Sequence, residues 1–137
     1  MGQQQTLLVL LSIMIVIVAI SIGIKLFNSY SINSIKQNCL SELNYMRARS
    51  ADYYKTSQYM GGSSYGSYKW DSNSLAAYIG MDYNDTNGVE TVNAIYTITV
   101  LNGDITFLAD PKDQAFETNI QMDYNVDTQV TTLTYPE

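Results

Sequence analysis

Side chains that could support catalysis are scarce in this chain of 137 residues. There is no histidine and one cysteine, Cys39, so a histidine-activated nucleophile, an internal disulfide framework and a cysteine-based zinc site are all excluded. No two carboxylates have a spacing that suggests acid–base catalysis, and no glycine-rich loop matches a phosphate-binding motif. We therefore expect neither enzymatic activity nor a cofactor, and we interpret Cys39 as a small buried apolar residue.

An acidic turn in the second half of the chain offers oxygen ligands of the kind that calcium prefers. The candidate ligands are Asp82, Asn84, Asp85, Asn87 and Glu90. The spacing is not that of an EF-hand loop, because the glycine required at the sixth position, counted from Asp82, comes one residue late at Gly88. A weak calcium site and a metal-free turn stabilised by Asx side chains are the two interpretations, and we favour the second.

The same turn contains Asn84-Asp85-Thr86, the only N-x-S/T sequon of the chain. Asn84 on an exposed turn could be glycosylated in an organism that has the enzymes for it. Such triplets also arise often by chance, so glycosylation at Asn84 is a weak expectation.

Tyrosine is unusually frequent, with twelve residues. Five of them fall close together in the sequence, at Tyr53, Tyr54, Tyr59, Tyr65 and Tyr68. Stacked rings could carry electrons along a polymer, but tyrosine is also well suited to a partly hydrated subunit interface. We favour packing or adhesion over conduction.

The distribution of charge divides the chain into two parts after Ser50. Residues 1–50 contain four basic residues and one acid, Glu42, for a net charge of +3, whereas the remainder contains three lysines and twelve acids, for −9. Together they give the overall charge of −6. The length and this acidic balance exclude a two-domain enzyme and a nucleic-acid binder with a basic face, so no nucleic-acid partner is predicted.

Residues 7–24 form an apolar segment without any ionisable group, LLVLLSIMIVIVAISIGI. At about 1.5 Å per residue, a helix of this length approaches the roughly 30 Å thickness of a bilayer's hydrocarbon core. A cleaved secretory signal fits less well, because the preceding MGQQQ carries no Lys or Arg. The stronger interpretations are a single-span membrane anchor and a helix that leaves the membrane to form the core of a polymer.

Beyond residue 30 the apolar positions recur at helical spacing and form one stripe. We expect this stripe to pack against the rest of the chain through Ile32, Ile35, Cys39, Leu43, Met46 and Tyr53. No Pro or Gly interrupts residues 24–60. The pattern predicts one helix from about Gln3 to Ser57, roughly 80 Å long, ended by Gly61 and Gly62.

An apolar half that can cross a membrane, continued without a break by an amphipathic half and followed by a small head, resembles the type IV pilin superfamily. That superfamily includes type IV pilins, secretion-system pseudopilins and archaeal pilins, and the resemblance covers residues 1 to about 58. It implies that the apolar half lies in the inner (cytoplasmic) membrane as a monomer and packs with neighbouring copies in the core of an extracellular filament. The partners it implies are other copies of the chain, the inner-membrane pilus assembly machinery and a prepilin peptidase.

The N-terminal sequence departs from the family pattern. There is no basic leader, no glutamate before Glu42 and no proline before Pro111. Family members commonly have a glutamate at the fifth position of the mature chain. Cleavage after Gly2 would place Leu7 at that position, whereas a mature start at Met1 would place Gln5 there, a neutral isostere of glutamate.

Two sets of residues in the apolar half could contact neighbouring copies. Polar contacts between N-termini could use Gln3, Gln4 and Gln5, although a solvated helix start explains this triplet equally well. The small residues Ser12, Ala19 and Gly23 share a face on which helices could approach closely, although a span of this length usually contains a few small residues by chance. The filament-core contacts predicted on this half are Leu7, Leu11, Ser12, Ile15, Ala19 and Gly23.

One pattern opposes an external head. Four basic residues follow the apolar segment, and by the positive-inside tendency they would keep that side in the cytoplasm. They are Lys25, Lys36, Arg47 and Arg49. An external head requires these cations to be spread along the helix, where they could meet acids of adjacent heads.

The residues after the long helix predict a small antiparallel sheet. A Gly, Ser and Tyr loop is followed by a short helix, Leu75–Ile79, capped by Asn73 or Ser74 and stopped by Gly80. Four strands are expected at residues 92–101, 105–109, 116–124 and 129–135, with Asn102-Gly103 as a type I′ hairpin turn. The apolar face of this sheet should cover the helical stripe, because so short a head buries little core alone.

The sequence as a whole predicts an α+β protein with three segments: a hydrophobic helix at residues 1–30, its amphipathic continuation at 31–58, and an acidic, Tyr-rich β-sheet head at 59–137. The function we expect is that of the major structural subunit of a type IV pilus-like filament. The alternatives are a pseudopilin or minor pilin of a secretion or uptake machine, and a monomeric single-pass membrane protein whose head binds a ligand or partner.

Overall fold

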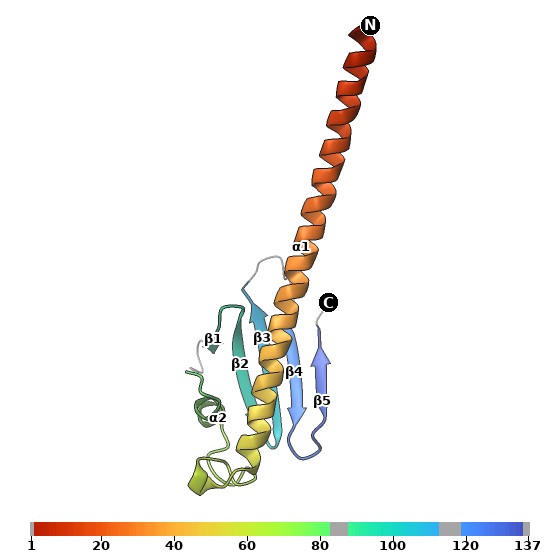
Figure 1. Cartoon of the computed structure of the whole chain (residues 1–137). Helices are drawn as coiled ribbons and strands as arrows, with labels where there is room; N and C mark the ends of the chain where they lie inside the picture. Colours follow the sequence, from red (N-terminus) through yellow and green to blue (C-terminus); the bar gives the residue numbers. More distant parts are fainter. Residues whose placement is uncertain (1, 83–87, 113–118, 136–137) are drawn as a thin grey trace. The chain divides into compact units, whose positions relative to one another are not determined.

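The computed structural model of the chain describes residues 2–82, 88–112 and 119–135. Its elements in chain order are α1 (Gly2–Lys55), a short 3-10 helix (Gln58–Met60), α2 (Ser72–Ile79), β1 (Val89–Glu90), β2 (Ala94–Leu101), β3 (Asp104–Pro111), β4 (Ile120–Asn125) and β5 (Thr131–Thr134) (Figure 1). The predicted α+β class, a long N-terminal helix packed against a small antiparallel sheet, is confirmed.

The chain divides into two compact units, Met1–Ser34 and Ile35–Glu137. The boundary lies inside α1, so this helix contributes to both units. The second unit, which we call the head unit, contains the last part of α1, α2 and all five strands.

The long helix α1 is continuous from Gly2 to Lys55, because its sequence contains no proline and only Gly23 as an internal glycine. The predicted end at about Ser57 lies two residues beyond the observed one, whereas the prediction that Gly61-Gly62 ends this helix is wrong. The helix ends at Lys55 because the following loop folds back onto its last turn: the amides of Ser63 and Tyr65 donate to the carbonyls of Tyr53 and Tyr54 at 2.9 and 2.7 Å. Gly61, at φ 86°, instead caps the separate 3-10 helix.

The short helix α2 begins earlier than predicted. Its N-cap is Asp71, whose Oδ1 accepts a hydrogen bond from the amide of Ser74 at 2.8 Å, so the predicted caps Asn73 and Ser74 lie inside the helix. Aspartate is among the strongest N-cap residues, and its carboxylate reaches the free amide in the first turn. Gly80 ends the helix in the left-handed conformation, at φ 89°.

The sheet has five strands rather than the four predicted, in the order β1-β2-β3-β4-β5, and every neighbouring pair is antiparallel. The strand missed is β1, whose two residues Val89 and Glu90 are too few to show an alternating pattern. β2 begins at Ala94 rather than Val92, which is 92% exposed. Asn102 and Gly103 adopt φ 45° and 97°, as a type I′ turn requires.

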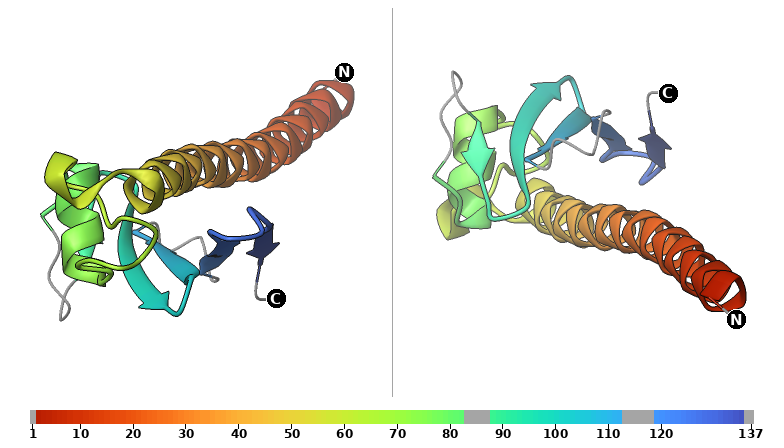
Figure 2. Two further views of the ribbon diagram at one scale, coloured as in Figure 1. Left: turned by 90° about the horizontal axis from the view of Figure 1, so that it is seen from below. Right: turned by 90° about the horizontal axis from the view of Figure 1, so that it is seen from above.

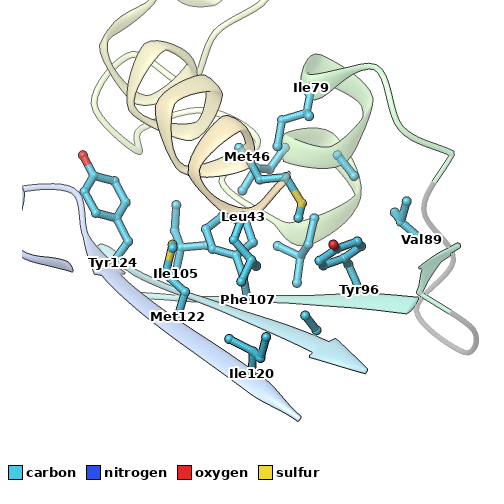
Figure 3. Packing of buried hydrophobic residues seen from close by; sticks show 14 of the residues in the cluster. Leu43, Met46, Ile79, Val89, Tyr96, Ile105, Phe107, Ile120, Met122 and Tyr124 are labelled. Carbon is cyan, nitrogen blue, oxygen red and sulfur yellow. The ribbon is translucent and has the colours of Figure 1, made fainter. Parts of the chain in front are cut away.

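The core of the head unit lies between one face of the sheet and the two helices (Figure 2). Alternate residues of β2, β3 and β4 point to this face, so that register pairing produces apolar rows such as Ile98, Phe107 and Met122. Leu43 and Met46 of α1 pack over the rows (Figure 3). The last part of α1 is therefore a component of the head's core.

Candidate functional site

The apolar half of α1 is the largest unusual surface of the described chain. All sixteen large apolar side chains from Leu7 to Phe27 are between 50% and 73% exposed. The most apolar 18-residue window has a mean hydropathy of 3.1, and none of it is buried. The helix is therefore long and apolar enough to cross a membrane.

The predicted filament-core residues all lie on this exposed surface; they are Leu7, Leu11, Ser12, Ile15, Ala19 and Gly23. The hydroxyls of Ser12 and Ser21 donate to the carbonyls of Leu8 and Ile17, each at 2.8 Å, so these polar groups are satisfied within the helix. A Cβ added at Gly23 would meet no atom within 4 Å. The small residues therefore leave open, nearly apolar positions on the helix surface.

The N-terminal amides of Gln3, Gln4 and Gln5 lie in the first turns of α1 and are exposed. The neighbouring Thr6 hydroxyl donates to the carbonyl of Gly2 at 2.8 Å. The side-chain amides of all three glutamines are therefore accessible from outside the helix.

Four of the six residues of the predicted stripe lie in the core of the head unit. Cys39, Leu43, Met46 and Tyr53 are at most 2% exposed, and Ile35 packs partly buried against them. Ile32 falls in the first unit and is half-buried. Ser50 is also fully buried, where its hydroxyl donates to the carbonyl of Met46 at 2.6 Å. Its position between Met46 and Tyr53 at spacings of four and three was the available sequence signal.

Glu42 was not singled out as a site residue, yet it links α1 to the sheet. Its Oε1 accepts from Asn93 Nδ2 at 2.7 Å, and its Oε2 accepts from Thr91 Oγ1 at 3.1 Å and from the hydroxyl of Tyr96. Burial, and secondly this hydrogen bond to Glu42, raises the pKa of the Tyr96 hydroxyl well above its usual range. The only signal in the sequence was that Glu42 is the one acid among the first 50 residues.

Three of the four basic residues that follow the apolar segment contact the head. Lys36 Nζ lies 4.1 Å from the ring centroid of Tyr135, and Arg47 Nη1 donates to Thr131 Oγ1 at 3.1 Å. Arg49 Cζ lies 5.0 Å from the ring centroid of Tyr78. These cations are therefore part of the folded head unit rather than of a separate basic segment.

The predicted tyrosine cluster is partly assembled in the structure. Tyr53 and Tyr54 both contact Trp70, with ring centroids 6.0 and 5.3 Å apart, and the series continues to Tyr78 at 5.0 Å and Tyr65 at 5.6 Å. Sequence reasoning missed Trp70 and Tyr78, because their proximity depends on the fold of residues 61–79. The other two predicted members are exposed, Tyr59 at 91% and Tyr68 at 43%.

The candidate calcium ligands are not brought together by the described residues. Asp82 is exposed, whereas Asn84, Asp85 and Asn87, and with them the sequon at Asn84, lie outside the described residues. Glu90 forms a salt bridge with Lys112 at 2.6 Å, which lowers the pKa of its carboxyl. Within residues 2–82, 88–112 and 119–135 no three His, Cys, Asp or Glu side chains are placed to hold a metal ion.

Comparison with known proteins adds no assignment, because no family model, no curated protein and no solved structure matches the chain significantly. Two features therefore define the candidate site: the exposed apolar half of α1 and the junction that anchors its other half in the head. The first is an apolar surface exposed on the helix, and the second joins the same helix to the folded head.

Proposed function

We propose that the chain is the major structural subunit of a type IV pilus-like extracellular filament, held in the cytoplasmic membrane as a monomer and assembled through the apolar half of α1. The role is structural rather than catalytic. Its partners are other copies of the chain and the membrane machinery that assembles and processes such subunits.

One observation carries this proposal: a single uninterrupted helix has an apolar half exposed all round and a second half built into the core of a small head. Water is an unsuitable environment for the apolar half. Burying a large apolar side chain is worth about 1.5–3 kcal/mol, so moving these sixteen side chains out of water is favourable by an amount on the order of tens of kcal/mol. A bilayer and the core of a helical polymer both remove these side chains from water.

The attachment of the head also supports the proposal. Residues 39–53 of α1 are held in the core of the head unit by buried side chains and by Glu42, so the second part of the helix is a structural component of the head. Residues 2–55 are helical throughout, and this stretch contains no proline and no run of glycine and serine of the kind that forms flexible linkers.

The decisive experiment compares I15D with A77D in the full chain, expressed in cells that assemble the native protein. A77D introduces the same charge at an exposed position of α2. An aspartate near the middle of an apolar helix costs about 2.5–3.5 kcal/mol, so I15D should reduce filaments in sheared surface material about tenfold or more, as counted by electron microscopy. A77D should leave the filament yield unchanged.

The membrane fraction separates the alternatives. I15D should still be recovered in membranes, because the other large apolar side chains retain most of the favourable transfer energy. Absence of filaments from cells with the unmodified chain, with all protein in the membrane fraction, would contradict the proposal and favour a membrane-anchored binding head. Short filaments containing this chain only as a trace component would instead indicate a pseudopilin or minor pilin.

A further inference from the structure

A small basic cleft lies between α1 and the end of the sheet formed by β4 and β5. It has a volume of about 190 Å³ and is lined by Arg47, Ala48, Ala51, Lys55, Tyr124 and Gln129. Arg47, Ala51 and Lys55 follow one another at four-residue spacing, so the Cα atoms of the two basic residues are separated by about 12 Å along the helix axis. The small side chains of Ala48 and Ala51 leave the space between them open.

The two cations of this cleft have no carboxylate partner among the described residues. Arg47 donates to the hydroxyl of Thr131, and the one salt bridge in the described part of the chain joins Lys112 to Glu90. Asp127, the acid of the adjoining β4–β5 turn, accepts a hydrogen bond from the hydroxyl of Tyr54 at 2.5 Å instead. Of the seven basic residues, only Lys112 has a carboxylate within salt-bridge distance in the described part of the chain, so Arg47 and Lys55 share this property with the other cations. The cleft therefore presents positive charge to a ligand from outside the subunit.

The opposite face of the same sheet is acidic. Along β3 and β4, residues point alternately into the core and away from it. Asp104, Asp110 and Asp123 occupy positions that point away from the core, on the outer face. The outward strand positions of β2, β3, β4 and β5 include no Lys or Arg in the described residues. A hollow of about 380 Å³ beside this face is lined by Asp104 and Asp123 together with threonines, Asn125 and the apolar Leu101 and Val130. Asp104 accepts a hydrogen bond from Asn125 Nδ2, and Asp123 accepts from Thr106 Oγ1 and Gln121 Nε2, and both carboxylates keep their negative charge on the subunit.

The basic cleft opens on the side of the sheet that carries α1, whereas the acidic hollow lies on the side turned away from it. Tyr124 lines both hollows, but their charged groups come from different sides of the sheet: Arg47 and Lys55 belong to α1, whereas Asp104 and Asp123 hold outward strand positions. Two different patches that complement each other on separate copies form a heterologous contact, which repeats either as a closed ring or, where the rotation does not close, as an open helical polymer. Charge complementarity of this kind identifies the occupant of the cleft as a second copy of this chain rather than a small anion.

We infer that the Arg47–Lys55 cleft of one subunit receives the Asp104 and Asp123 face of the next, and that this contact sets how adjacent heads meet in the filament. The inference rests on the proposed function and adds to it a defined contact between heads. Exposed ion pairs contribute little individually and are screened within about 8 Å at physiological ionic strength. The apolar helices therefore supply most of the attraction, and the charges select the orientation and register of the heads.

A charge-swap experiment tests the contact in the full chain. K55E and D104K alter two exposed residues on opposite sides of the sheet. Each single variant should lower the filament yield about fivefold or more, because it places like charges opposite each other at every contact. The double variant K55E/D104K should restore the yield towards that of the unmodified chain, since opposite charges then face each other again.

Matched controls separate this contact from a general effect of charge. K69E and D82K make the same changes of charge at exposed positions outside the cleft and the outer sheet face, and they should leave the yield unchanged. Near-ultraviolet circular dichroism of each variant in detergent micelles should match that of the unmodified chain. K55Q removes the positive charge without adding a negative one and should give an intermediate filament yield. If K55E alters the fold, K55Q still tests the contribution of this charge.

Two outcomes overturn the inference. If K55E reduces the yield while D104K does not, and the double variant shows no rescue, the cations contact an anionic lipid headgroup or another anion instead of the neighbouring head. If K55E and D104K both assemble normally while I15D abolishes filaments, the contact between heads is wrong but the proposed function stands. Loss of the proposed function is recognised separately, by the absence of filaments from the unmodified chain.

Discussion

At the scale of single residues, Glu42 is the main polar link between α1 and the sheet. Its two carboxylate oxygens accept hydrogen bonds from three side chains near the start of β2. A partly buried carboxylate with this many donors fixes the position of the helix along the sheet more narrowly than apolar contacts do. We therefore expect Glu42 to contribute to setting which part of the stripe lies over which strand.

Replacement of Glu42 by glutamine tests this role. The glutamine amide has one oxygen, so at least one of the donors Thr91, Asn93 and Tyr96 would face an NH₂ group. Leaving a partly buried donor unsatisfied costs about 1–3 kcal/mol. E42Q should lower the midpoint of denaturant unfolding of the full chain in micelles, followed by the fluorescence of Trp70.

The matched control is E90Q, which removes a carboxylate from the exposed salt bridge with Lys112. Exposed ion pairs contribute little to stability, so this variant should unfold close to the unmodified chain. Equal midpoints for E42Q and the unmodified chain would show that the three hydrogen bonds do not hold the helix on the sheet.

At the scale of elements, the end of α1 depends on a close contact of backbone with backbone. A Cβ added at Gly62 would lie 2.1 Å from the carbonyl oxygen of Thr56, whereas one added at Gly61 would meet nothing within 4 Å. Gly61 does adopt a positive φ of 86°, which disfavours any other residue moderately. The two neighbouring glycines are thus required for different physical reasons.

This difference predicts that G62A destabilises the head more than G61A. G61A should cost about 1 kcal/mol, the usual penalty for a side chain in the left-handed region. G62A should cost about 2 kcal/mol or more, because the backbone of the loop must move to relieve the overlap. Thermal unfolding of both full-chain variants in micelles gives the comparison, and an equal effect would mean that the loop adapts to the added methyl.

The elements that were predictable from the sequence are those with a local pattern. The long helix and the stripe through Leu43 and Met46 follow from a 3.6-residue period, and the hairpin at Asn102-Gly103 follows from turn chemistry. β1, the cap Asp71 and the contacts of Glu42 were missed, because they depend on pairing between segments distant in the sequence or on short elements without a period. Similarly, the ring series through Trp70 exists only once the loop after α1 has folded back.

At the scale of the whole molecule, the position of the basic residues bears on which side of a membrane the head occupies. Lys36, Arg47 and Arg49 are bound to side chains or backbone of the head unit. They consequently move with the head and do not form a free basic segment beside the membrane. The positive-inside tendency applies best to short, unfolded loops, so these cations are weaker topological signals than the sequence suggested.

Accessibility to a membrane-impermeant maleimide tests the orientation. T128C places a thiol on an exposed turn, while the native Cys39 is fully buried and serves as an internal unreactive control. The proposed function predicts labelling of T128C on intact cells or spheroplasts, and no labelling of the unmodified chain. Labelling of T128C only after membrane permeabilisation would place the head in the cytoplasm and contradict assembly outside the cell.

The burial of Cys39 has a further consequence for the lifetime of any assembly. It is the only cysteine of the chain and has no exposed surface, and burial raises the pKa of its thiol. Copies therefore cannot be joined by disulfide bonds unless the head first opens. In the polymer proposed above, subunits not joined by disulfide bonds could be withdrawn intact, returned to the bilayer and used again.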